Sequence, residues 1–228
     1  MLQTGLALSR VRATMNLKKF IRWPRPLNAA VHLRRVHELL SDSNPAKALA
    51  DTEIQRAAEI RSLAQRRAFL AARKLAREVL SVPLNCAPEA VPILGASNGK
   101  PGILGGDIQF NLSHCEDWCA IAWSAESIVG VDVEVIRPVP DMETILNNYF
   151  PPAAQRDFYA ARPQEQTAVF FRWSTQIEAA LKASGDSLDD SYVCLNHVLH
   201  AVCDGVPGVA LAVAAVGKGP LTITWHLP

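Results

Sequence analysis

The sequence predicts an α+β fold of two similarly built halves with a cleft between them. Apolar stretches with the two-residue period of strands alternate with longer stretches that have the three-to-four-residue period of helices. The order strand, helices, strands occurs twice along the chain. With 49% hydrophobic and 20% charged residues, 228 residues can form the cores of both halves. We therefore expect halves over residues 27–120 and 121–228.

The first half is expected to begin with a strand and to continue with helices. Residues 29–40 alternate loosely between apolar and polar side chains, and the turn residues 41–45 end this pattern. Residues 51–80 place apolar side chains at helical spacing between arginines, which predicts one or two amphipathic helices. Pro83 and Pro88 are expected to end this region, because proline lacks the backbone donor that a helix interior needs.

The remaining elements follow from the same two periods. Strand-like patterns lie around the boundary between the halves, and prolines separate them from a helical region. The expected strands are residues 108–114, 119–123, 128–136, 192–202, 209–216 and 221–226, and the expected helices are residues 141–148, 152–161 and 164–184.

Composition argues against several classes of protein. The 23 basic and 22 acidic residues leave the chain nearly neutral, so we expect no nucleic-acid partner. The longest apolar stretch, residues 206–216, is shorter than the roughly 20 residues that span a bilayer, so we expect no membrane contact. Five cysteines without a Cys-x-x-Cys pair indicate reduced thiols and a cytoplasmic location. Residues 1–26 carry basic but no acidic side chains, and we expect a basic extension without stable order.

Two motifs point to other chemistry but lack its context. Residues 95–99 match the Gly-x-Ser-x-Gly elbow of serine hydrolases, which needs a helix directly afterwards. The sequence Lys-Pro-Gly at 100–102 follows instead, so we predict a turn. His197, His200 and Cys203 have spacings seen in zinc sites, but residues three apart on a strand face opposite sides, which favours simple packing.

A pair of carboxylates lies in an otherwise apolar predicted strand. The two-residue period puts Asp132 and Glu134 on the same face. Carboxylates held close together repel each other unless a cation lies between them, and oxygen ligands suit Mg²⁺, which usually binds substrate phosphates as well. An edge strand with a solvated acidic face is an equally good interpretation of these residues alone.

Two further features place polar groups together. Glu178 and Lys182 are four residues apart on a predicted helix and share one face, as in many surface ion pairs. Ser113 and His114 end a predicted strand, where a hydroxyl, an imidazole and backbone N–H groups can hold phosphate oxygens. Lys100 adds a positive charge upstream. Each feature taken singly is most often structural.

Taken together, these motifs occur in a fixed order over roughly residues 50–185. The order and spacing resemble those of the 4'-phosphopantetheinyl transferase superfamily, and of its surfactin-type group, in which one chain contains two pseudo-symmetric halves. The resemblance rests on the arginine-rich stretch Arg66 to Arg77, Gly99-Lys100-Pro101, Phe110-Asn111-Leu112-Ser113-His114, Gly130-Val131-Asp132-Val133-Glu134, and Glu178-Ala179-Ala180-Leu181-Lys182-Ala183-Ser184-Gly185.

The resemblance implies an enzyme that moves the 4'-phosphopantetheine arm of coenzyme A to a serine of an acyl or peptidyl carrier protein and releases 3',5'-ADP. It implies Mg²⁺ held by Asp132, Glu134 and Glu178. Glu178 would also be the general base, and Lys182 would stabilise the departing pyrophosphate charge. Because both halves lie in one chain, a monomer is expected. Contacts with the coenzyme A phosphates are implied for Lys100, Ser113, His114, and Arg73 or Arg77.

One position departs from the family pattern. The family reads Trp-(Ser/Thr)-x-Lys-Glu, whereas Ile177 precedes Glu178 here, and Trp173 stands one residue early, a rotation of about 100° on a helix. We expect reduced or altered activity, and we expect Ile177→Lys to preserve or raise the rate. A relative that binds coenzyme A or a carrier protein without transfer is the alternative interpretation.

Overall fold

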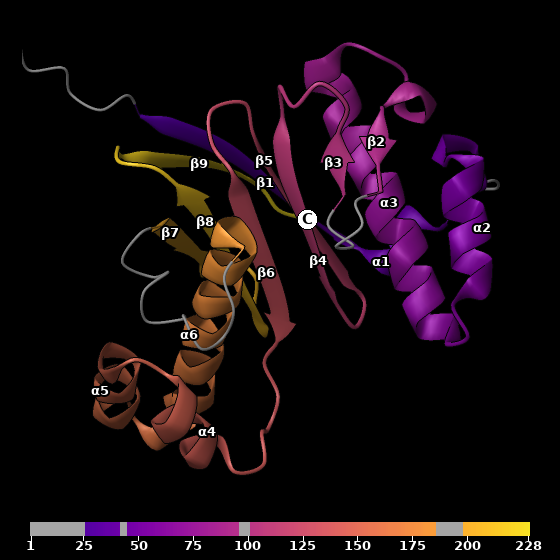
Figure 1. Cartoon of the computed structure of the whole chain (residues 1–228). Helices are drawn as coiled ribbons and strands as arrows, with labels where there is room; N and C mark the ends of the chain where they lie inside the picture. The colour runs from indigo at the N-terminus through magenta and orange to yellow at the C-terminus, as the bar shows by residue number, and fades with distance from the viewer. Residues whose placement is uncertain (1–25, 42–44, 96–100, 186–197) are drawn as a thin grey trace, which may run out of the picture.

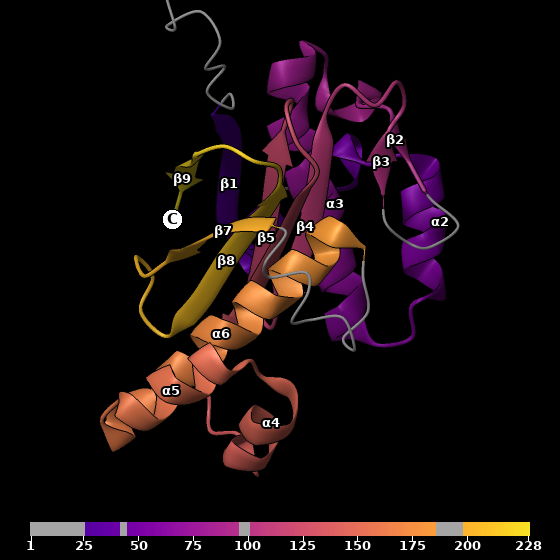
Figure 2. The same cartoon turned by 60° about the vertical axis from the view of Figure 1, so that its left-hand side comes forward.

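The computed structural model describes residues 26–41, 45–95, 101–185 and 198–228, and it confirms the predicted α+β class. Two sheets face each other, and a long helix covers the outer face of each (Figures 1 and 2). The strand order is β4-β5-β1-β9 in the first sheet and β6-β8-β7 in the second, and β2 and β3 form a separate pair. The strands are β1 Leu27–Arg35, β2 Ile93–Leu94, β3 Gly102–Ile103, β4 Gln109–Cys115, β5 Trp118–Ser124, β6 Val129–Val135, β7 Val198–Cys203, β8 Val209–Val216 and β9 Leu221–His226.

The core between the two sheets accounts for the alternation in the strand sequences. Val131 and Val133 of β6 belong to the same buried cluster as Val31 and Leu33 of β1, and all four side chains are fully buried. Side chains alternate between the two faces of a strand. The intervening positions of β6, which include the acidic residues, therefore face outward toward the helix of the second sheet.

Helix α3 (Leu63–Leu84) covers the outer face of the first sheet. It begins after Ser62, whose hydroxyl accepts a hydrogen bond from the Gln65 N–H at 3.4 Å. It continues one residue beyond Pro83, which was expected to end it, because a proline in the last turn removes only one backbone hydrogen bond. The helix ends at Asn85, which adopts the left-handed conformation with φ 50°.

The shorter elements of this half lie beside α3. The strand expected over residues 29–40 ends at Arg35, because the next four residues form the short helix α1. These elements are α1 Val36–Leu39, the 3₁₀ helices Pro45–Ala48 and Pro88–Ala90, and α2 Asp51–Glu59.

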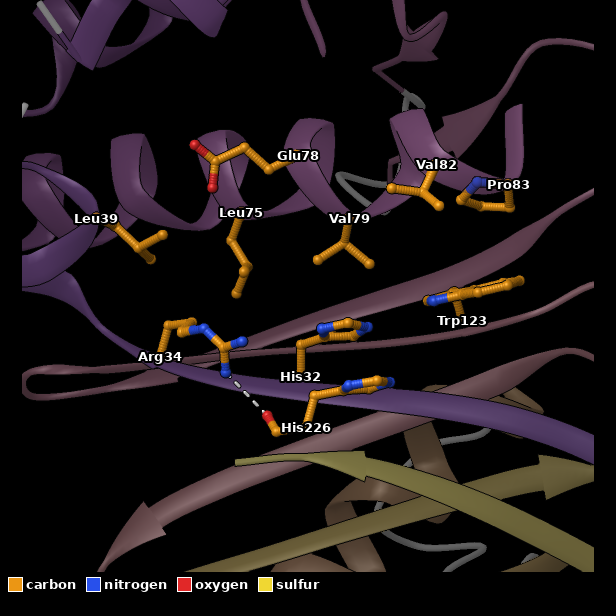
Figure 3. A pocket seen from close by; sticks show the side chains of 10 residues that line it. All are labelled: His32, Arg34, Leu39, Leu75, Glu78, Val79, Val82, Pro83, Trp123 and His226. Atoms are coloured by element: carbon orange, nitrogen blue, oxygen red, sulfur yellow. Dashed lines mark hydrogen bonds between the residues drawn. The ribbon is translucent and has the colours of Figure 1, made fainter. Parts of the chain in front are cut away.

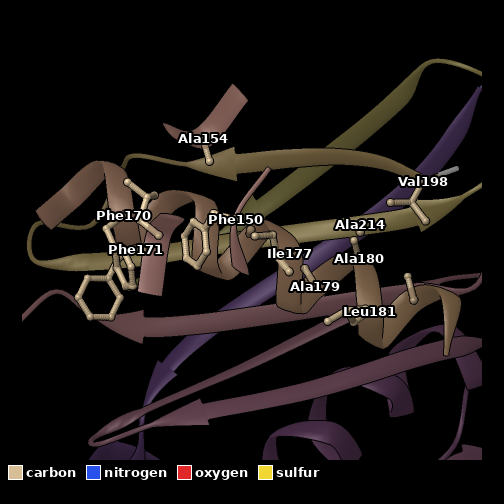
Figure 4. Close-up of a cluster of buried hydrophobic side chains, with 14 of the residues drawn as sticks. Phe150, Ala154, Phe170, Phe171, Ile177, Ala179, Ala180, Leu181, Val198 and Ala214 are labelled. Atoms are coloured by element: carbon tan, nitrogen blue, oxygen red, sulfur yellow. The ribbon is translucent and has the colours of Figure 1, made fainter. Parts of the chain in front are cut away.

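Helix α6 (Pro163–Ser184) covers the outer face of the second sheet and follows α4 (Met142–Tyr149) and α5 (Pro152–Ala160). Its buried side is anchored by an aromatic cluster, which Figure 4 shows at one end of the helix. The rings of Phe150 and Phe170 stack there with centroids 4.8 Å apart. This packing fixes the rotation of α6, and with it the side chains that α6 presents to β6.

The two sheets do not follow the expected division of the chain after residue 120. That boundary falls inside β5, which pairs with β1 and β4 in the first sheet. The last strand, β9, also returns to the first sheet and pairs in parallel with β1. In the part of the chain that the structure describes, no helix is long and apolar enough to cross a membrane.

Candidate active site

The backbone of α6 approaches β6 very closely at Gly130. A Cβ atom at this position would lie 2.1 Å from the carbonyl oxygen of Ala179 and 2.6 Å from the backbone nitrogen of Ala183. No side chain fits in this space, so the contact requires glycine. The close approach brings the part of α6 that carries Glu178 and Lys182 over the acidic face of β6.

Three of the predicted residues form one hydrogen-bonded cluster at this contact. Oδ1 of Asp132 accepts hydrogen bonds from Lys182 Nζ at 2.6 Å and from Ser113 Oγ at 2.8 Å. Lys182 Nζ also donates to Ser113 Oγ at 3.1 Å and to the carbonyl oxygen of Val131 at 3.3 Å. The cluster therefore joins the first sheet, the second sheet and α6 at one point, which we call the seam cluster.

Asn111 lies two residues before Ser113 on the same face of β4 and contributes to the same seam. Its side-chain Oδ1 accepts a hydrogen bond from the backbone N–H of Val131 at 3.0 Å, and Asn111 is buried. Because β6 is an edge strand of its sheet, this N–H has no strand partner on that side. Asn111 belongs to the motif at residues 110–114, but the sequence alone predicted no role for it. The two-residue spacing between Asn111 and Ser113, which puts both side chains on one face of a strand, was the sequence feature that could have indicated this role.

The acidic residues of the site influence one another electrostatically. Burial raises the pKa of Asp132, and the neighbouring Lys182 and Ser113 oppose that rise. Burial also raises the pKa of Glu178, and the negative charges of Asp132 and Glu134 add to the rise. Glu134 Oε2 accepts hydrogen bonds from Arg137 Nη1 and from Cys115 Sγ, both at 3.2 Å.

These residues fit a divalent cation that prefers oxygen ligands. The described ranges contain no ready-made group of three His, Cys, Asp or Glu side chains that could hold a metal ion. However, Oδ2 of Asp132 is buried and makes no hydrogen bond within those ranges, and a buried unpaired oxygen is unfavourable without a partner. A cation would satisfy this oxygen and would relieve the repulsion with Glu178 and Glu134.

The remaining candidates for phosphate binding are only partly placed. His114 is exposed on β4, next to Ser113 in sequence and on the opposite face. Partial desolvation and the charge of Lys182 lower its pKa. The Arg73 guanidinium lies over the ring of Phe69 at 5.2 Å, and partial burial lowers its pKa. Lys100 lies outside the described residues.

Arg77 has a structural role that replaces the contact with coenzyme A considered above. Its side chain is 3% exposed and forms an ion pair with Glu53 of α2, with Nε 2.7 Å from Oε2. Its Nη1 donates to the backbone carbonyl oxygens of Pro88, Glu89 and Val91 at 3.1–3.2 Å. The guanidinium is thus occupied in holding α2 and the following turn against α3, so we leave Arg77 out of the site.

Ile177, which stands at the position of the family's lysine, is buried. This side chain is 3% exposed and lies in the apolar cluster under α6, as Figure 4 shows. Helix α6 is continuous from Pro163 to Ser184, and Trp173 Nε1 donates to Asp157 Oδ2 on α5 at 3.1 Å. The expectation that Ile177→Lys preserves or raises the rate stays a prediction, but the new ammonium would enter an apolar core.

The other two motifs gain no support as sites. Residues 96–99 of the Gly-x-Ser-x-Gly motif lie outside the described residues, as does His197. On β7, His200 is exposed and Cys203 is buried, so these two side chains point to different surroundings.

Comparisons with known proteins show which family the sequence resembles. The sequence profile of the 4'-phosphopantetheinyl transferase superfamily matches residues 128–203, which include β6 and α6. The chain is 30% identical over 222 residues to the 4'-phosphopantetheinyl transferase HetI of a Nostoc species, covering 88% of this chain and 93% of HetI. It is 32% identical over 155 residues to the 4'-phosphopantetheinyl transferase AcpT of Escherichia coli K12, covering 65% of this chain and 75% of AcpT. AcpT of Salmonella typhimurium is 39% identical over 112 residues, 49% of this chain and 57% of AcpT.

Proposed function

This chain belongs to the 4'-phosphopantetheinyl transferase superfamily, and from that membership we propose that it transfers the 4'-phosphopantetheine arm of coenzyme A to a serine of an acyl or peptidyl carrier protein. The serine oxygen attacks the β-phosphorus of coenzyme A, and the bond to the bridging oxygen of 3',5'-ADP breaks. The observation that carries the proposal is the seam cluster, where a lysine and a carboxylate from different elements meet beside a second carboxylate of α6.

Glu178 is proposed as the general base for the carrier serine. It lies four residues before Lys182 on the same face of α6. Burial and the adjacent Asp132 raise its pKa, which moves the carboxylate closer to the range in which a base accepts a proton effectively. Glu178 would take the serine proton as the oxygen attacks phosphorus, so no strong base would have to come from solvent.

Lys182 is proposed to stabilise the charge that develops on the departing phosphate. Its ammonium is held in place by Asp132 and Ser113 before any substrate binds, so little reorganisation is needed during the reaction. Ser113 and His114, on β4, are proposed to contact the phosphates of coenzyme A. Lys100 and Arg73 are proposed as further positive charges for the same groups.

Asp132, Glu134 and Glu178 are proposed to hold Mg²⁺. Support comes from the unpaired buried oxygen of Asp132 and from the mutual repulsion of the carboxylates. When bound, the metal would neutralise negative charge on the pyrophosphate. Because Glu134 is engaged by Arg137 and Cys115, it would have to exchange those partners to become a ligand.

We also propose that the chain acts as a monomer of the surfactin-type group, with two pseudo-symmetric halves. The order strand, helices, strands before and after the start of β6 supports this assignment. A second candidate function is binding of coenzyme A or a carrier protein without transfer, and it is favoured by the apolar Ile177 at the position where the family pattern has a lysine.

The deciding experiment is the intact mass of an apo acyl or peptidyl carrier protein after incubation with the full chain, coenzyme A and Mg²⁺. A mass increase of one phosphopantetheine group supports transfer, and it should disappear with EDTA or when the acceptor serine of the carrier is replaced by alanine. No increase with several carriers, together with measurable binding of coenzyme A in a calorimeter, would replace transfer by the binding function.

A further inference from the structure

A cavity of about 360 Å³ lies between α3 and the first sheet, on the face of that sheet that α3 covers (Figure 3). The seam cluster lies elsewhere, because Asn111 and Ser113 point from β4 toward β6. The upper wall consists of the apolar side chains Leu75, Val79, Val82 and Pro83. Val82 is 79% exposed, so the wall is not closed from solvent. None of these residues takes part in the proposed transfer.

The floor of the cavity is flat and aromatic. His32 of β1 and His226 of β9 are paired across the sheet, and their rings stack with centroids 4.0 Å apart and planes 9° apart. Trp123 of β5 continues this surface beside them (Figure 3). Stacked rings below and aliphatic side chains above leave a slot that suits a planar ligand.

Hydrogen-bond donors stand at the two ends of the slot, and the one at the Trp123 end has no acceptor among the described residues. Nε1 of Trp123 is buried and has no partner within the described ranges. Nη1 of Arg34 donates to the carbonyl oxygens of Leu33 at 2.7 Å and His226 at 3.0 Å, which holds the guanidinium in place. Figure 3 shows Arg34 and Trp123 on opposite sides of the histidine pair. A ligand with an acceptor oxygen at each end would satisfy Trp123 Nε1 and add a charged partner for Arg34.

The slot carries one positive charge that no neighbouring carboxylate of the described chain balances. Arg34 forms no ion pair within the described part of the chain, whereas Glu78 at the rim is paired with Lys74 at 3.6 Å. One guanidinium without a counter-charge suits a monoanion, and the planar fork of arginine matches a carboxylate. A ligand with several phosphates would bring more negative charge than this slot can balance.

The strand register gives the approximate spacing of Arg34 and Trp123 along the sheet. Trp123 lies opposite Ala30, four residues before Arg34 on β1, and four residues of a strand span roughly 13 Å. We propose that this cavity is a second ligand site, which binds a flat aromatic carboxylate of about two fused rings, with its carboxylate at Arg34 and an acceptor group at Trp123.

The proposal is tested by titrating the full chain with 6-hydroxy-2-naphthoate, which carries a carboxylate and a hydroxyl at opposite ends of two fused rings. Calorimetry should show saturable binding at one site. Arg34→Gln and Trp123→Phe should each weaken binding by about 10-fold, as expected for the loss of one charged or buried hydrogen bond. The matched control Arg56→Gln changes an exposed arginine of α2 that does not line the cavity, so it should leave the affinity unchanged. The uncharged 2-naphthol should bind more weakly than the carboxylate.

Three results would overturn the proposal. These are no binding at millimolar probe, equal binding by the wild type and both pocket variants, and displacement of the probe by coenzyme A, which would place it in the transferase site. If Arg34→Gln does not fold, as judged by circular dichroism, Trp123→Phe and the comparison with 2-naphthol decide. Because the readout is probe binding without a carrier protein, the outcome is independent of the proposed transfer activity.

Discussion

Lys182 and Asp132 form an ion pair of 2.6 Å in which the carboxylate side chain is 7% exposed and the ammonium side chain 30% exposed. The pair joins α6 to β6, and Ser113 holds it from the first sheet. A pair this buried loses solvation on both sides, so it depends on the extra hydrogen bonds around it. Changes in this cluster are therefore expected to affect both the chemistry and the packing of the three elements.

We predict that Asp132→Asn lowers the rate of carrier modification by at least about 100-fold, as expected when a preorganised charge is removed from a reaction centre. It should also lower the free energy of unfolding by about 3 kcal/mol, because the half-buried Lys182 ammonium loses the carboxylate charge that faces it at 2.6 Å. Mass spectrometry of the carrier measures the rate, and urea unfolding measures the stability.

The matched control is Asp204→Asn. Asp204 also pairs with a basic side chain, Arg172 at 2.8 Å, but it is 71% exposed. An exposed pair contributes at most about 1 kcal/mol, and we expect an unchanged rate. An Asp132→Asn protein with the wild-type rate would remove Asp132 from the proposed metal and reaction site.

Gly130→Ala is predicted to destabilise the protein by about 1–3 kcal/mol or more, the range for overpacking a filled core. The added methyl group would collide with the backbone of α6 at Ala179 and Ala183, which cannot rotate away as a side chain would. The displaced helix should also move Glu178 and Lys182 from β6, so the rate should fall with the stability. Gly102→Ala, where no heavy atom lies within 4 Å of the new Cβ, should change neither quantity.

Ile177→Lys is predicted to lower the stability rather than to repair the family motif. The position is 3% exposed, and an unpaired ammonium in such surroundings costs several kcal/mol. Ile177→Val removes one methylene group from the same place and should cost only about 0.5–1.5 kcal/mol. Thermal unfolding compares the three proteins. A lysine variant that is as stable as the wild type and faster would restore the original expectation.

The strands and helices were largely predictable because their patterns are local. The apolar alternation of β6 and the helical period of α6 arise from burial on one side of each element, so they can be read along the chain. The return of β9 to β1 was not predictable. The parallel pairing between Leu27–Arg35 and Leu221–His226 depends on contacts between two segments that are separated by most of the sequence. A boundary based on sequence order could not include that strand.

The residues of the site also differ in how well the sequence alone predicts their roles. Its acidic residues stood out because carboxylates are unusual in an apolar strand, whereas the role of Asn111 depends on an unpaired N–H of another strand. Arg77 looked like the other arginines of α3 in sequence. Only its position beside Glu53 and the carbonyl groups of the following turn reveals a structural role. Residues whose function is to join distant segments carry little local signal.

His32 is predicted to make the stability depend on pH in the acidic range. Burial, followed by the nearby His226 and Arg34, lowers the pKa of His32 from 6.5 to about 4. The unfolded chain therefore takes up a proton on this imidazole below about pH 6.5, whereas the folded protein does so only near pH 4. Protonation of the unfolded state alone favours unfolding, so the contribution of His32 is complete above pH 6.5 and is lost as the pH falls toward 4.

Urea unfolding of the wild type and His32→Gln between pH 7 and pH 4.5 tests this prediction. One proton gives a slope of at most about 1.4 kcal/mol per pH unit, and this component should be absent from the variant. His226→Gln removes the stacked neighbour from β9 while Arg34 and Glu78 still line the cavity. The pKa of His32 should then rise, so the loss of stability should end at a higher pH. Parallel curves for the wild type and His32→Gln would show that His32 titrates alike in the folded and unfolded chain.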